Sequence, residues 1–397
     1  MPSRTTLPAD AGERGDAPGP VAGEACACCS GGFHQPADGG GSARASADPE
    51  MPSLDWDEAA DQLARSGITW TNPGAGGGDD AEPVRVTYGF LSDADASDPG
   101  GGRDYRAMTA DEIAMTEYAM RIIAETANIE FVRVAGPGGR YLDDPSDAQL
   151  DLDAMADTSA GLARMSWSGS SYRAATVSIG EQGLEDLGSY AFRTALHEVA
   201  HAVGLSHPSD YAGRVRYADD AEYREDSAQY TVMSYFDETA TGADYGHVYS
   251  TNLMLHDIAA LQSLYGANAA TRSGDTVYGF GANADDPGWS ADGAEHAMIG
   301  AIWDGGGRDR LDLSGYADDQ RIDLRQEAFS DAGGLNANIA VARGAVIEDA
   351  AGGAGDDEVR GNDADNTLAG GAGADLLFGG GGDDILYGDG GPPEWQG

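Results

Sequence analysis

A run of nine-residue repeats near the carboxyl end constrains most tightly how this 397-residue chain can fold. Three copies open with Gly-Gly-x-Gly, whose turn exposes backbone carbonyls, and carry Asp at the sixth position. Oxygen ligands of this kind suit Ca²⁺ rather than a soft transition metal. The pattern therefore predicts a coil of short parallel strands that binds calcium at its turns. The copies begin at Gly352, Gly361, Gly370, Gly379 and Gly388.

The eighth position of each copy separates this interpretation from a flexible Gly-Asp linker. A linker has no reason to keep an aliphatic residue there, whereas a coil needs one to fill its thin core. The second copy departs from the pattern at Ala364 and Asn366, and the degenerate fifth copy has Pro393 where Asp belongs. The aliphatic residues expected to point inward are Val359, Leu368, Leu377 and Leu386. The expected calcium ligands in the three regular copies are Gly353, Gly355, Asp357, Gly371, Gly373, Asp375, Gly380, Gly382 and Asp384.

A second motif, A-L-H-E-V-A-H-A-V-G-L-S-H-P, indicates a metal site with an open position. His197 and His201 are four residues apart and share one face of a helix. Gly204 lets the chain leave that helix, so that His207 can become the third ligand. Three neutral imidazoles are typical of catalytic zinc, and Glu198 beside the first ligand can accept a proton from the attacking water. Ordinary helix histidines are the alternative, but the longer motif fixes five positions.

Met233 follows in the apolar run Y-T-V-M-S-Y-F. A soft thioether below a zinc site can pack against the ligand histidines without competing for the metal. A buried Met is usually only a core residue, so its order after the zinc motif is what gives it weight. The remaining histidines, among them His256, are interpreted as ordinary residues.

Taken with M-S-Y, D-I-A-A-L-Q-S-L-Y-G-A-N and D-T-V-Y-G-F, the zinc motif resembles the serralysin family of secreted bacterial metalloproteases over roughly residues 54–391. The resemblance implies an α+β metzincin-type zinc protease domain followed by an all-β parallel β-roll of the RTX type. It implies that Tyr235 is an extra zinc ligand that swings off the metal and stabilises the oxyanion. It also implies an edge strand that pairs with the peptide substrate, for which residues 161–168 are the candidate.

The resemblance implies one further calcium site, around the segment W-D-G-G-G-R-D. Val346 stands where the family commonly has Thr, which matters little if only its carbonyl is used. The implied carbonyl ligands are Arg272, Gly274 and Thr276, and the site is completed by Asp304, Gly306, Gly307, Asp309 and Glu348.

The charge of the chain bears on its partners. The formal net charge is −45, with 68 acidic against 23 basic residues, and every basic residue is Arg. This balance argues against nucleic acid and anionic membranes and favours cations. Adaptation to a salty habitat or a codon bias would also explain it. No apolar run approaches the length of a membrane span.

Three regions are expected. Residues 1–50 are rich in Gly, Ala, Pro and Asp and predicted to be disordered. Their cluster Cys26, Cys28 and Cys29 could hold a metal, cap the zinc, or be an accident of a flexible tail. Residues 51–267 form the catalytic domain and 268–397 the β-roll, which looks truncated because the family's C-terminal type I secretion region is not visible.

The function expected is a secreted, extracellular and monomeric zinc endopeptidase that acts on proteins and peptides. It would use one catalytic Zn²⁺ and several structural Ca²⁺. The alternative is a calcium-dependent adhesion or structural protein with an inactive protease domain. The intact Glu198 and the three intact histidines argue against that alternative.

Overall fold

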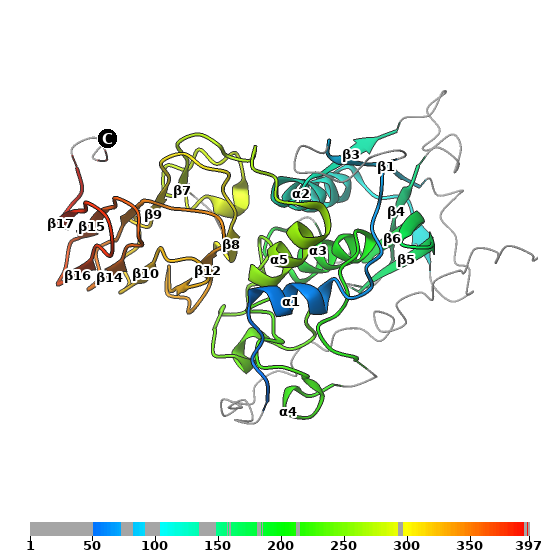
Figure 1. The fold of residues 1–397 in the computed structure, drawn as a ribbon, viewed down its shortest axis with the longest axis horizontal. Coiled ribbons are helices and arrows are strands. Elements are labelled where there is room, and N and C mark those ends of the chain that lie inside the picture. Colours follow the sequence, from blue (N-terminus) through cyan, green and yellow to red (C-terminus); the bar gives the residue numbers. More distant parts are fainter. Residues whose placement is uncertain are drawn as a thin grey trace, which may run out of the picture.

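The computed structural model describes residues 51–395 apart from 73–81, 92–103, 135–147, 157, 159, 181–183, 185, 212–214, 293–296 and 393–394. The predicted disorder of residues 1–50, and the cysteine cluster within them, lie outside the described residues. The described chain consists of an α+β region followed by a region built almost wholly of short strands (Figure 1).

The α+β region is organised on a six-stranded sheet in the order β3-β1-β4-β6-β5, with β2 paired to β4. The β1–β3, β1–β4 and β4–β6 pairs are parallel, whereas β5 runs antiparallel to β6 and forms the edge. The expected edge strand is therefore present. The strands are β1 (Val84–Phe90), β2 (Tyr105–Arg106), β3 (Ile129–Arg133), β4 (Leu150–Met155), β5 (Gly161–Ser168) and β6 (Ser171–Gly180). The helices are α1 (Trp56–Leu63), α2 (Ala110–Thr126), α3 (Tyr190–Ala202), α4 (Tyr217–Asp220), α5 (Leu255–Tyr265) and the 3₁₀ turn η1 (Glu238–Ala240).

Local sequence explains where the main helices begin. Thr109 caps α2 by accepting the Glu112 N–H, while the Glu112 carboxylate accepts the Thr109 N–H at 2.7 Å. This reciprocal capping box satisfies donors that a helix start otherwise leaves open. Ser189 caps α3 through its hydroxyl alone, which accepts the Phe192 N–H at 3.0 Å. Every residue of α3 after the first is buried, so the helix lies in the core beside β5 and β6.

The strand-rich region contains two wholly parallel sheets, and from β13 onward successive strands alternate between them. One has the order β17-β15-β13-β9-β7 and the other β10-β14-β16, and a third sheet joins β11, β12 and β8. The strands are β7 (Val277–Gly279), β8 (Gly300–Ile302), β9 (Arg310–Asp312), β10 (Arg321–Asp323), β11 (Phe329–Ser330), β12 (Ile339–Val341), β13 (Asp349–Ala351), β14 (Glu358–Arg360), β15 (Thr367–Gly371), β16 (Leu376–Phe378) and β17 (Ile385–Asp389), with the 3₁₀ turn η2 (Pro287–Trp289).

The eighth-position residues of the repeats fall in register, as the alternation requires. Leu368 pairs with Leu386 in one sheet and Val359 with Leu377 in the other. Val359 and Leu368 are fully buried, but Leu386 is 46% exposed. The inward position expected for Leu386 is therefore only partly realised, because β17 is the outer strand of its sheet.

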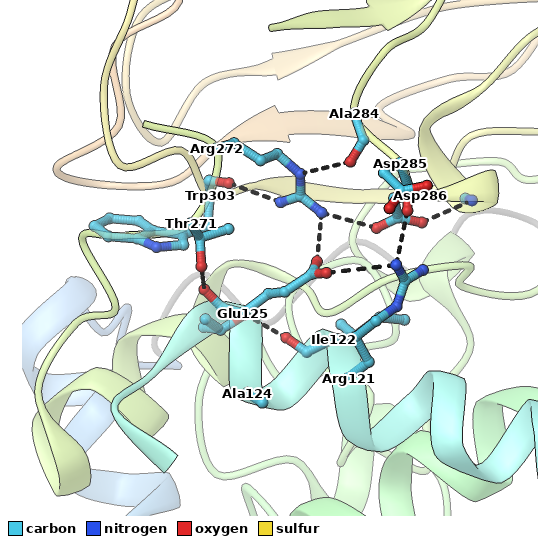
Figure 2. A network of polar contacts seen from close by, with 12 residues as sticks. Arg121, Ile122, Ala124, Glu125, Thr271, Arg272, Ala284, Asp285, Asp286 and Trp303 are labelled. Atoms are coloured by element: carbon cyan, nitrogen blue, oxygen red, sulfur yellow. Dashed lines mark hydrogen bonds and ion pairs between the residues drawn. The ribbon is translucent and has the colours of Figure 1, made fainter. Parts of the chain in front are cut away.

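The two regions meet at the end of α2 through a partly buried arginine (Figure 2). The guanidinium of Arg272 donates to Glu125 on α2, to the carboxylate of Asp286 at 3.0 Å and to the Trp303 carbonyl at 3.2 Å. Tyr118 on α2 also donates to Asp286. Burial strengthens such charge-assisted contacts because little water competes for the groups.

The close packing of β7 against β9 gives a first prediction. A Cβ on Gly279 (φ +99°) would lie 2.0 Å from the Asp312 carbonyl oxygen, whereas one on Gly242 (φ +105°) would meet open space. Both Ala substitutions should cost about 1 kcal/mol through the backbone angle, and Gly279→Ala about 1–3 kcal/mol more through the overlap. Melting temperatures at one fixed calcium concentration measure the difference. Equal shifts for the two variants would contradict the predicted close packing.

Candidate active site

Three histidines converge on one point in the α+β region. His197 and His201 lie one turn apart on α3, and His207 comes from the segment that follows it. The Nε2 atom of His207 lies 3.2 Å from that of His197 and 3.0 Å from that of His201. All three residues are buried, and among the described residues they form the one group of three potential ligands within 4.8 Å of one another.

Hydrogen bonds at the far side of two rings set their orientation. The Nδ1 atom of His197 lies 2.9 Å from the Val232 carbonyl oxygen, and that of His201 lies 2.7 Å from the Leu205 carbonyl oxygen. A carbonyl only accepts, so Nδ1 carries the proton and Nε2 turns its lone pair toward the common point. Burial, together with the neighbouring His201 and His207, holds the pKa of His197 well below its usual value, which favours the neutral form.

This donor set fits a zinc ion. Zinc–nitrogen bonds of about 2.0–2.1 Å in tetrahedral geometry place the nitrogens about 3.3 Å apart. The observed separations are close to that value. Neutral imidazoles with hydrogen-bonded outer nitrogens are the usual form of such ligands.

The segment after α3 that carries His207, here called the arm, is held in place by contacts with residues of the α1 segment. Gly204 adopts φ +114°, and a Cβ there would lie 2.8 Å from the Ile68 carbonyl oxygen. Two side chains of the α1 segment then bind the arm: Arg65 donates to the His207 carbonyl, and Gln62 donates to the Pro208 carbonyl at 2.7 Å. The glycine therefore allows the turn, and α1 fixes where the turn leads.

Glu198 lies beside His197 on α3 and is fully buried. Its side chain occupies space that the edge strand leaves open, because a Cβ on Gly161 of β5 would lie 2.3 Å from the Glu198 Cγ atom. The carboxylate thus lies between the zinc-motif helix and the edge strand. Sequence reasoning placed Glu198 at the site but did not find the need for Gly161.

The turn formed by residues 231–236, here called the Met233 turn, completes the site. Met233 is fully buried in the main core. The ring of Tyr235 lies 4.7 Å from that of His207 and 6.0 Å from that of His197, measured between centroids. The structure thus brings Tyr235 to the histidine triad and buries Met233 in the core of the same turn.

Asp257, at the start of α5, is a residue that sequence reasoning missed. Its buried carboxylate accepts the Thr231 hydroxyl at 2.5 Å, the Val232 N–H at 2.9 Å and the Met254 N–H at 3.0 Å. Val232 is the residue whose carbonyl receives His197. Asp257 therefore fixes the partner of a candidate ligand, and the acidic residue in the first helical turn of H-D-I-A-A-L-Q was the only available signal.

The residues expected to form the further calcium site also come together. Thr276 N–H donates to Oδ1 of Asp309 at 2.8 Å, and Gly306 N–H donates to Asp304 at 2.7 Å. Glu348 accepts the Asp309 N–H at 2.8 Å. The loops pack backbone to backbone, since a Cβ on Gly307 would lie 2.6 Å from the Gly274 carbonyl oxygen. Arg272 opens the first loop with φ +47°.

A hard cation fits this loop. Asp309 is fully buried, and its Oδ2 atom has no hydrogen-bond partner. Burial, with Asp304 and Glu348 nearby, raises the pKa of Asp309 to about 7. A buried carboxylate oxygen without a donor is costly unless a proton or a cation neutralises it. Calcium, with its preference for oxygen ligands, would do so.

The sixth-position carboxylates of the repeats lie at successive turns. Asp357 accepts the Gly353 N–H at 2.7 Å, and Asp375 accepts the Asp357 N–H at 3.0 Å. In the degenerate second copy Asn366 accepts the Asn362 N–H at 2.9 Å, so an amide replaces the carboxylate without its charge. Asp384 accepts the Asn366 N–H at 3.0 Å. The turn glycines with positive φ are Gly371, Gly373, Gly380 and Gly382, and Gly355 packs against the backbone of Asp318.

Comparisons with known proteins agree with the motif. Residues 267–391 match the family described as Peptidase M10 serralysin C terminal. Serralysin C of Dickeya chrysanthemi is 39% identical over 311 residues, or 77% of this chain and 64% of that protein. Metalloprotease AprA of Pseudomonas entomophila (strain L48) is 36% identical over 77% of this chain and 64% of that protein. Serralysin of Proteus mirabilis is 36% identical with the same coverage.

These matches confirm the resemblance to serralysins. The matched region spans slightly less than two thirds of each relative. Within the part of the chain that the structure describes, no helix has both the length and the apolar character needed to cross a bilayer.

His256, next to Asp257, gives a prediction about how folding stability changes at acidic pH. It is buried, its Nδ1 atom has no hydrogen-bond partner, and burial lowers its pKa from 6.5 to about 3. The unfolded chain therefore binds this proton more readily, and folding stability falls as the pH drops from 6.5 toward 3. In His256→Gln that part of the loss should disappear. Denaturant midpoints between pH 7 and pH 4.5, measured in chelator for both proteins, check this, and parallel curves would contradict it.

Proposed function

We propose that this chain is a secreted zinc-dependent endopeptidase of the serralysin type that hydrolyses peptide bonds in extracellular proteins. The observation that carries the proposal is the convergence of three imidazole nitrogens on the helix region that also carries a buried glutamate, whose side chain packs against the edge strand β5. The named relatives support it, since they are serralysins and a metalloprotease. No described feature favours the adhesion alternative, which would need neither Glu198 nor the triad.

His197, His201 and His207 would hold the zinc ion. When bound there, zinc supplies Lewis acidity toward the scissile carbonyl and lowers the pKa of a water. Glu198 accepts a proton from the attacking water and passes it to the leaving amine. Its place between α3 and β5 suits that task, because the substrate is proposed to lie along β5.

Two further elements bind and stabilise the reacting peptide. The edge of β5 can pair with an extended peptide through backbone hydrogen bonds, as sheet edges do in other peptide complexes. The peptide bond would thereby lie beside Glu198. Tyr235 is proposed to act on the oxyanion, which its position next to His207 and His197 allows.

The second part of the proposal concerns the strand-rich region. We infer that residues 268–397 form a parallel β-roll of the RTX type, distinct from a catalytic domain at residues 51–267. Several calcium ions would bind at the repeat turns and at the loop of Asp304 and Asp309. The stacked carboxylates repel one another, so each cation stabilises the fold that gathers them.

Glu198→Gln tests the catalytic assignment. The three ligands survive this change, while the group that accepts the proton does not. Casein hydrolysis should fall about 10²–10⁴-fold with zinc content unchanged by atomic absorption. Glu130→Gln, which alters an exposed carboxylate on β3, is the matched control and should retain activity. Near-parental hydrolysis by Glu198→Gln would refute the assigned role.

A calcium titration of the full chain tests the second part. Without calcium, at saturating zinc, far-ultraviolet circular dichroism should show less strand signal and a lower melting temperature, and both should recover as calcium is added. Asp309→Asn should shift the titration to higher calcium, because the amide cannot neutralise the cation. Asp219→Asn, an exposed change on α4, should not. A complete strand signal in chelator that calcium leaves unaltered would exclude calcium-dependent folding.

A further inference from the structure

Two chain segments meet at the candidate metal centre, and a single buried carboxylate lies between them. One segment follows α3 and carries His207, and the other is the Met233 turn, which carries Tyr235. The carboxylate belongs to Asp226, whose exposure is 0%. Because it is shielded from water, its hydrogen-bond partners must come from the protein.

Those partners are three hydroxyl groups. Ser209, two residues after His207, donates to Oδ2 of Asp226. Tyr211 and Ser234 each donate to Oδ1 at 2.6 Å. Ser234 immediately precedes Tyr235 in the chain. Asp226 therefore joins the segment of the third candidate ligand to the segment of the tyrosine.

Tyr211 extends this connection to the rings themselves. Its ring stacks on that of Tyr235, with centroids 4.5 Å apart and planes at 21°. The same ring lies 5.3 Å from that of His207. Its hydroxyl accepts the Tyr235 N–H at 3.4 Å. Tyr211 is thus held at its hydroxyl by Asp226, while its ring packs against the rings of both His207 and Tyr235.

The charge of the carboxylate matters for this arrangement. A serine or tyrosine hydroxyl can rotate, so alone it does not fix a direction. An ionised carboxylate accepts several hydroxyl protons at once, and charge-assisted bonds are shorter and stronger than neutral ones. An amide at this position would offer a single acceptor oxygen and would present an N–H₂ group to donors. At least one of the three hydroxyls would then lose its acceptor.

We propose that Asp226 is a positioning residue that fixes Tyr235 relative to His207 through Ser209, Tyr211 and Ser234. The inference rests on the proposed function, because the role of Tyr235 at the metal belongs to that proposal. Asp226 does not reach the reacting atoms itself. Among the 68 acidic residues of the chain, nothing local in R-E-D-S distinguishes it.

The kinetic consequence follows from the roles of the two sites. Peptide binding along β5 does not involve the Asp226 network, whereas stabilisation of the oxyanion depends on where Tyr235 lies. Asp226→Asn should therefore lower kcat by about tenfold or more and change KM by less than about twofold, since small misplacements of a reacting group cost rate rather than binding. Tyr211→Phe, which keeps the ring and removes the hydroxyl, should act in the same direction.

The experiment replaces zinc by cobalt in the full chain and records the visible absorption spectrum, which reports ligand geometry, together with kcat, KM and melting temperature. The matched control is Tyr118→Phe, because the Tyr118 hydroxyl also donates to a buried aspartate, Asp286, at the junction of the two regions. Asp226→Asn and Tyr211→Phe should alter the spectrum and kcat. Tyr118→Phe should alter only the melting temperature.

An unchanged spectrum and kcat in a folded Asp226→Asn, with a loss of stability alone, would overturn the proposal. If Asp226→Asn does not fold, Ser209→Ala and Ser234→Ala decide, since each removes one hydroxyl and leaves the carboxylate. If both serine variants show changes of kcat and of the spectrum, even small ones, the proposal is supported. If neither variant changes kcat or the spectrum, the proposal is overturned. A parent protein that binds cobalt but hydrolyses no peptide contradicts the proposed function, whereas the response of the spectrum still decides the positioning role.

Discussion

The site depends on one requirement: a buried imidazole that turns Nε2 toward a metal must satisfy its other nitrogen elsewhere. In this protein the acceptors are the peptide carbonyls of Val232 and Leu205. Ligand orientation is therefore set by the backbone of neighbouring segments. For this reason several side chains near the site form hydrogen bonds to backbone groups of these segments. Asp257 accepts the Val232 N–H, and Arg65 donates to the His207 carbonyl.

In the strand-rich region, the buried carboxylates must likewise find a partner that neutralises their charge. Its turns gather carboxylates, and the fully buried Asp309 leaves an oxygen that only a proton or a cation can satisfy. The loop that would bind calcium begins at Arg272, whose side chain also forms an ion pair with Glu125 on α2 (Figure 2). Because α2 packs against α3, Arg272 connects this loop through Glu125 and α2 to the helix that carries two histidines.

Local patterns and the repeat period were sufficient to predict much of this molecule. Side-chain contacts between residues far apart in the sequence could not be predicted from it. The zinc motif spans eleven residues, so helical periodicity and one glycine place its ligands. The capping box of Thr109 is equally local, and the register of the repeats follows from their fixed nine-residue period; both are present. By contrast, Asp226 binds Ser209 across 17 positions, and Asp257 binds Val232 across 25. No periodicity relates such pairs, and tertiary packing alone brings them together. The exposure of Leu386 likewise reflects its place at a sheet edge rather than its place in the repeat.

The Met233 turn shows how two buried carboxylates divide one task. Asp257 holds its first half through Thr231 and Val232, and Asp226 holds its second half through Ser234. The first half is bound partly through a backbone N–H, which cannot rotate, and it supports a ligand that must stay in place. The second half is bound through hydroxyls whose direction the charged carboxylate sets, and it supports Tyr235. The turn therefore takes the position of His197 from one carboxylate and the position of Tyr235 from the other.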